Sequence, residues 1–278
     1  MTKHWTVRAA GAALAMATAV GAHAADLSSR WGPPAPMFAP APFTWTGFYI
    51  GANAGGVWAT GNTTVNPFGA TVDSYYSSYL PGSLNTGSSG FIGGGQAGFN
   101  FQSGGAVFGI ETDFDGTSLS HVKNWTGGSF GAGSVLLPAT DFFTATAAGR
   151  LDWLGTTRAR IGFVATPDNR LMFYGTGGVA YGGGSVHGSM YDFDNYVGWY
   201  GSSSPTRVGW TIGGGVEYAI TNSITLKGEY LYYNLGSATY AILPLSGFVG
   251  YPFVAGTYAF AKTAFEGSIL RAGLNYKF

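Results

Sequence analysis

The sequence contains no cysteine and little charge. Without cysteine the chain has no disulfide, no thiolate nucleophile and no cysteine-ligated metal. Its 13 basic and 13 acidic residues make up 9% of the chain, against about 25% in an ordinary soluble domain. This composition argues against a soluble domain, and the balanced charge argues against nucleic-acid binding, which needs a basic surface. Beyond the N-terminus, no uninterrupted run of about 18 apolar residues predicts a transmembrane helix.

Glycine and aromatic residues are abundant instead. The chain carries 47 glycines in 278 residues, and each glycine inside a helix costs about 1 kcal/mol relative to alanine. Aromatic residues make up 16% of the sequence. A β-sheet protein tolerates both features, so the composition favours sheet over helix.

The N-terminus reads as an export signal. Lys3 and Arg8 precede an apolar run over residues 9–20, and small residues follow at Ala22 and Ala24. The run is shorter than the roughly 20 residues that cross a bilayer. We therefore expect a signal peptide over residues 1–24, a proline-rich periplasmic leader over 25–44 and the folded domain over 45–278.

Eight stretches alternate between apolar and polar residues with the period of a β-strand. They cover residues 48–58, 91–102, 106–115, 150–163, 171–181, 208–220, 224–233 and 268–278. Their polar faces carry six charges of each sign: Glu111, Asp113, Asp115, Asp152, Glu217, Glu229, Arg150, Arg158, Arg160, Lys227, Arg271 and Lys277. These faces are too sparse in charge for a water-exposed surface, and balanced opposite charges suit an enclosed polar interior. The sequence thus predicts lipid on the apolar faces and a charge network inside.

The segments between the stretches alternate in length. Residues 103–105, 164–170 and 221–223 form short turns, whereas about 59–90, 116–145, 187–206 and 236–263 read as long polar loops. This pattern predicts an all-β fold: an eight-stranded antiparallel transmembrane β-barrel, connected as an up-and-down meander. Aromatic residues near strand ends fit either interfacial girdles or ordinary sheet packing: Trp58, Trp153, Trp210, Tyr218, Tyr276 and Phe278.

Four sequence segments resemble the small outer-membrane proteins of alphaproteobacteria, which have an OmpA-like barrel and include surface antigens and porin-like proteins. They are WTGFYIGANAGG from Trp45, GIETDFD from Gly109, LDWLGTTRARIG from Leu151 and the terminal LNYKF. The resemblance implies the bacterial outer membrane as location, with lipid, lipopolysaccharide and the assembly machinery as partners. It also implies that Tyr276 and Phe278 form the C-terminal assembly signal. The chain ends without the periplasmic domain of full-length OmpA, so peptidoglycan binding is not implied.

We expect a structural role in the envelope, with the long loops displayed outside. The alternatives are a small-solute porin and loop-mediated surface binding, as an adhesin or a haem binder, although no motif selects an extracellular ligand. We expect no enzyme, because the one local Ser-His candidate is His187 beside Ser185 or Ser189, and serine is abundant enough for this proximity to arise by chance. We also expect no cofactor and no metal. Asp192, Asp194 and Asn195 lack the glycine and downstream glutamate of a calcium loop.

Overall fold

A computed structural model describes residues 43–68, 83–129, 141–193, 197–204, 206–245 and 258–278. The helices and strands of these residues comprise strands alone: β1 (Gly47–Thr60), β2 (Asn62–Phe68), β3 (Ser83–Asn85), β4 (Ser88–Ser103), β5 (Ala106–Ser129), β6 (Asp141–Val164), β7 (Leu171–Asp192), β8 (Val197–Ser203), β9 (Thr206–Ala219), β10 (Ile224–Pro244) and β11 (Tyr258–Lys277). None of the described segments is a helix that could cross a membrane. The signal peptide, nearly all of the leader, Asp194 and Asn195 lie outside the described residues.

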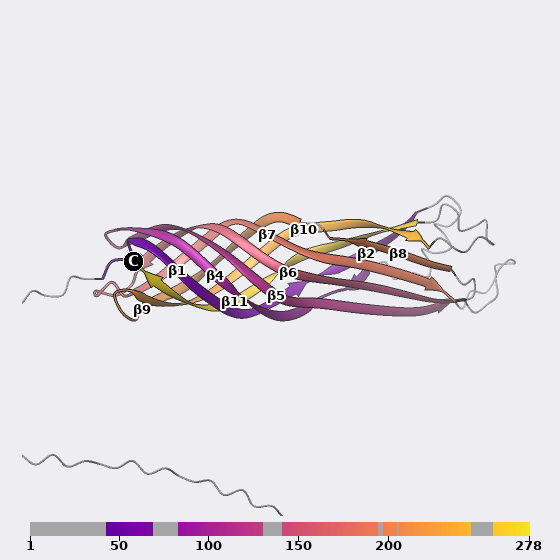
Figure 1. The fold of residues 1–278 in the computed structure, drawn as a ribbon, viewed down its shortest axis with the longest axis horizontal. Helices are drawn as coiled ribbons and strands as arrows, with labels where there is room; N and C mark the ends of the chain where they lie inside the picture. The colour runs from indigo at the N-terminus through magenta and orange to yellow at the C-terminus, as the bar shows by residue number, and fades with distance from the viewer. Residues whose placement is uncertain (1–42, 69–82, 130–140, 194–196, 205, 246–257) are drawn as a thin grey trace, which may run out of the picture. The chain divides into compact units, whose positions relative to one another are not determined.

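Eight of these strands close a ring, in agreement with the predicted meander. The order around the ring is β1, β4, β5, β6, β7, β9, β10 and β11, and β11 pairs with β1 again, with every pair antiparallel. Figure 1 shows these strands running obliquely about a common axis. The closed ring leaves no free strand edge around the part of the barrel that it forms.

The strands are much longer than predicted. β5 continues to Ser129, and β6 already begins at Asp141. Near the same end, β2 pairs with β11, and β8 pairs with β7 and β10 (Figure 1). Much of the four segments predicted as long loops is therefore strand, and that prediction was wrong. In these extensions serine, threonine and glycine replace the outward apolar residues, so the sequence lacks the apolar-polar alternation that indicates a membrane strand.

The outer surface of the ring carries an apolar band. Large apolar side chains stand exposed on every ring strand, for example Phe48, Phe114, Ile161, Phe173, Ile212, Leu226 and Leu270. Trp58 follows Phe48 on β1 by ten residues, or about 33 Å along the strand. At a tilt of about 45° this corresponds to a height of roughly 23 Å, close to the roughly 25 Å apolar band of a transmembrane barrel.

The interior is filled in layers. At the end that carries the short turns, one apolar cluster includes Phe43 and Trp45 from the segment before β1, packed against Val107 and Met172. The buried charges follow. Beyond them lie two further apolar clusters, one around Leu154 and Leu231 and one around residues of β8 and the far ends of the long strands. Side chains therefore occupy the barrel axis from the turn end to the extensions.

Beyond the level of Trp58 and Trp210, toward the strand extensions, the inner and outer faces of the barrel exchange polarity. Here the interior is apolar and the outer face is polar, as shown by the exposed side chains of Arg150, Asp152, His187 and Lys262. Register shifts occur between Gly116 and Leu119, between Leu151 and Trp153, and between Asn234 and Ser237. On β6 and β10 an extra residue turns the following side chains to the other face. On β7 and β11 the same alternate positions stay inside, and the residues at these positions change from polar to apolar. The barrel thus has a lipid-type outer surface at one level and a water-type outer surface above it.

Candidate functional site: a buried charge network

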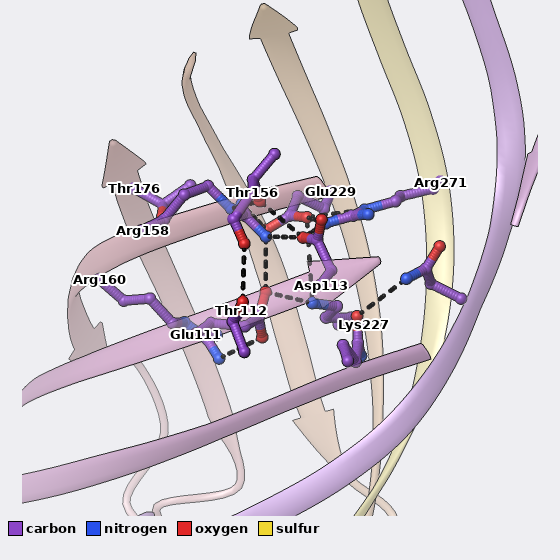
Figure 2. A network of polar contacts seen from close by, with 12 residues as sticks. Glu111, Thr112, Asp113, Thr156, Arg158, Arg160, Thr176, Lys227, Glu229 and Arg271 are labelled. Carbon is purple, nitrogen blue, oxygen red and sulfur yellow. Dashed lines mark hydrogen bonds and ion pairs between the residues drawn. The ribbon is translucent and has the colours of Figure 1, made fainter. Parts of the chain in front are cut away.

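The strand register brings together nine of the twelve charged residues predicted for the interior. Glu111 on β5 lies opposite Arg158 on β6, and Glu229 on β10 lies opposite Arg271 on β11. All the members have side chains that are no more than 3% exposed: Glu111, Asp113, Asp115, Arg158, Arg160, Glu217, Lys227, Glu229 and Arg271. Figure 2 labels most of these members and shows them converging from different strands: Glu111, Asp113, Arg158, Arg160, Lys227, Glu229 and Arg271.

Arg158 lies at the centre of this network. Its guanidinium contacts Glu111 at 2.7 Å, Asp113 at 2.9 Å and Glu229 at 2.9 Å, and its Nε donates to Thr156 at 2.8 Å. One side chain therefore links carboxylates from two strands that are not neighbours in the ring. A fully hydrogen-bonded arrangement of this kind is what makes a buried ion cluster tolerable.

The other three cations extend the network in both directions. Arg271 reaches Asp113 and Asp115, each at 2.6 Å, and Glu229 at 2.8 Å. Lys227 donates to Glu111 at 2.8 Å. Arg160 reaches Glu217 at 2.7 Å, and its guanidinium carbon lies 4.0 Å from the ring centroid of Tyr174. The network spans strands β5, β6, β9, β10 and β11 and ties the walls of the barrel together.

Neutral polar side chains complete the network. The Tyr49 hydroxyl donates to Glu111 at 2.7 Å, and the Tyr174 hydroxyl donates to Glu229 at 3.0 Å. Asn275 donates to Glu217 and accepts from Gln96. These residues carry no charge and so were not predicted as members of the network, although strand parity placed Tyr49, Gln96 and Asn275 on the polar faces.

Tyr49→Phe tests one of these neutral contacts. We expect the free energy of unfolding of the detergent-extracted barrel to fall by about 1–3 kcal/mol, because Glu111 loses a buried donor. The urea midpoint measures this loss. Tyr218→Phe is the matched control: Tyr218 is 47% exposed on the apolar outer band, and we expect its midpoint to stay unchanged. Equal midpoints for the two variants would show that the Tyr49 hydroxyl adds no stability.

Three of the predicted interior charges lie elsewhere. Arg150 and Asp152 pair with each other at 3.1 Å on the outer surface, with side chains 63% and 48% exposed. The bulge between Leu151 and Trp153 reverses the faces of β6 at this point, so their assignment to the interior was wrong. Lys277 lies at the turn end, where its Nζ donates to the carbonyl oxygens of Thr44 and Thr46 rather than to a carboxylate.

The structure also places the predicted aromatic and C-terminal residues. Trp58 and Trp210 stand half-exposed on the outer surface at the end of the apolar band near the extensions. Tyr276 and Phe278 lie exposed near the turn end, where their rings meet edge to face with centroids 5.3 Å apart. Trp58 and Trp210 thus lie at one limit of the apolar band, and Tyr276 and Phe278 lie at the other.

The remaining candidates form no catalytic constellation among the described residues. His187 is exposed on β7, and the neighbouring Ser185 hydroxyl accepts a hydrogen bond from Arg150 Nε at 3.2 Å. The described residues hold no group of three or more histidine, cysteine, aspartate or glutamate side chains that could bind a metal ion. The glycine runs at 93–95 and 182–184 lie inside strands, where neighbouring strands pass close to them.

Comparison with known families identifies the family of this barrel. The family described as "Outer membrane protein beta-barrel domain" matches residues 10–278. The chain belongs to this outer-membrane β-barrel family. Its location is therefore the bacterial outer membrane, as the sequence predicted.

The relative with the higher sequence identity supports the assignment. The chain is 39% identical over 269 residues to the 31 kDa outer-membrane immunogenic protein of Brucella melitensis, covering 96% of this chain and 98% of that protein. It is 28% identical over 197 residues to the 22 kDa outer membrane protein of Rhizobium leguminosarum bv. viciae, covering 71% and 67%. Among solved structures, it is similar to outer membrane protein OprG from Pseudomonas aeruginosa, with 12% identity, a TM-score of 0.42 and coverage of 84% and 96%.

Proposed function

We propose that this outer-membrane barrel is a closed structural element of the envelope. The observation that carries the proposal is the occupied interior. An apolar cluster with Trp45, a salt-bridged layer around Arg158 and an apolar layer around Leu231 follow one another along the axis. An eight-stranded ring has an interior that side chains nearly fill, so such a barrel supports the membrane without conducting solutes.

Planar-bilayer recording tests the closed interior. We expect purified, folded barrel to show no stable large-conductance opening, and proteoliposomes that contain it to exclude small sugars. Resistance of the inserted protein to added protease confirms that each preparation is folded and inserted. Stable large openings from such protein would contradict a closed barrel and would favour the small-solute porin.

The outer faces support proposals for the partners. The apolar band suits membrane lipid, and the polar surface above it suits the sugar and phosphate groups of lipopolysaccharide. Tyr276 on the last strand and Phe278 directly after that strand are exposed and accessible to the assembly machinery. Because the extensions have a water-type exterior, we infer that they project from the membrane and display the loops outside.

We further propose that the protein is not an enzyme. The hydroxyl of Ser185, one of the two serines that lie two residues from His187 in the sequence, accepts a hydrogen bond from Arg150, and Arg150 itself is paired with Asp152. The Brucella melitensis relative is named an outer-membrane immunogenic protein, which supports a surface role.

A further inference from the structure

The buried network contains one more acid than base. Its carboxylates are Glu111, Asp113, Asp115, Glu217 and Glu229, which is five, and its cations are Arg158, Arg160, Lys227 and Arg271, which is four. Among the described residues no further cation lies within ion-pair distance of these acids. Five minus four leaves a formal charge of −1 in a region enclosed by apolar layers. An uncompensated charge in such surroundings costs several kcal/mol.

The hydrogen bonds are distributed unevenly among these acids. Four of them accept from at least three side chains each; Glu111, for example, accepts from Tyr49, Arg158, Arg160 and Lys227. Asp113, Glu217 and Glu229 are similarly supplied. The Oδ1 atoms of Asp113 and Asp115 are both buried without a hydrogen-bond partner, but Asp113 accepts three hydrogen bonds through Oδ2, whereas Asp115 accepts from Arg271 alone. Asp115 is therefore the carboxylate that the network stabilises least.

Another unpartnered oxygen lies across the sheet from Asp115. Asn53 on β1 and Asp115 on β5 both lie opposite Gly94 on β4, which has no side chain to separate them. The carboxylate of Glu217 can only accept, so it fixes a chain of amides in which Asn275 donates to Glu217, Gln96 donates to Asn275 and Asn53 donates to Gln96. This chain leaves Asn53 Oδ1 buried without a donor.

We propose that the folded barrel binds one proton at Asp115, with the neutral carboxyl donating to the amide oxygen of Asn53. The proton brings the network to zero net charge and supplies the donor that Asn53 lacks. The carboxyl still accepts from Arg271 through its other oxygen. The charged groups that surround this site from the packed strands are Asp113 on β5, Arg158 on β6, Lys227 and Glu229 on β10 and Arg271 on β11.

Two amide substitutions distinguish a protonated Asp115 from the ionised Asp113 beside it. Asp115→Asn replaces a neutral acid with a group of the same shape that can donate to Asn53, so we expect a folding equilibrium constant equal to or above that of the wild type. Asp113→Asn removes a carboxylate that serves two arginines, and we expect at least about a 100-fold lower folding constant. Equal losses for the two variants would contradict a proton at Asp115.

The pH dependence gives a second readout. The unfolded chain releases this proton above about pH 4, whereas the folded chain retains it. The wild-type folding constant should therefore fall relative to that of Asp115→Asn by about tenfold per pH unit above that value, until the folded carboxyl itself ionises. A constant ratio between the two proteins would contradict the proposal.

Infrared spectroscopy of the wild-type barrel in detergent needs no variant to fold. We expect the carbonyl stretch of a protonated carboxylic acid at neutral pH, and we expect Asp115→Asn to lack it. Absence of the band in the wild type, or its persistence in the variant, would overturn the assignment.

A sodium series at constant ionic strength addresses a bound cation: a melting temperature that rises with sodium would show that a metal ion, and not a proton, balances the charge.

Discussion

We expect Arg158→Met to lower the free energy of unfolding by about 3–5 kcal/mol, the usual cost of removing one partner from a buried ion cluster. Methionine retains much of the aliphatic volume but donates nothing. Glu111, Asp113 and Glu229 each lose a direct contact of 2.9 Å or less. The urea midpoint of the detergent-extracted barrel measures the loss.

Arg150→Met is the matched control for this experiment. Arg150 lies on the same strand, and its side chain is 63% exposed in a pair with Asp152. Exposed pairs contribute about 0–1 kcal/mol, so we expect almost no change. If both variants shifted the midpoint equally, the interior network would not be the source of the stability.

We expect deletion of Asp152 to prevent the β6 extension from folding. Asp152 is the extra residue of the bulge between Leu151 and Trp153. Removing it while the turn end keeps its register would place Leu151 on the outer surface and Arg150 in the apolar interior. A lost leucine contact costs about 2–5 kcal/mol, and an unpaired buried charge costs several more, against a total stability of about 5–15 kcal/mol.

Cold SDS gels measure this effect, because a folded barrel and an unfolded chain migrate differently. Asp152→Ala keeps the chain length and is the matched control. Asp152 is 48% exposed, so we expect this substitution to change stability by less than about 0.5 kcal/mol. A deletion variant that folded as well as the control would show that the bulge does not determine the register of β6.

The sequence predicted the part of the barrel in which one simple rule holds. On the ring strands the outward residues are apolar and the inward residues polar, so parity alone placed Glu111, Arg158, Glu229 and Arg271 in the interior. Parity failed at Arg150 and Asp152, because a single bulged residue reverses the faces and its position depends on the pairing with β5 and β7. The contacts of Tyr174 with Glu229 and Arg160 depend on strands that only the closed ring brings together.

The strand extensions were missed for a different physical reason. Their outward serines and threonines and their inward alanines, glycines and valines give a weak contrast between the faces. Ala145 and Val186, for example, are buried in the interior cluster of this region. Strands surrounded by water have polar outward residues, whereas strands surrounded by lipid have apolar outward residues. With this difference taken into account, these segments have the pattern of strands that continue the strands of the ring.

The change from an apolar to a polar outer face along the strands has a consequence for immune recognition. Above the membrane, antibodies would meet stiff sheet as well as loops, and on each strand only every second side chain would be available to them. A synthetic peptide copied from β5 or β7 would expose both sets of side chains at once and would lack the neighbouring strands. Sera raised against intact cells should therefore bind the folded barrel better than the heat-denatured chain.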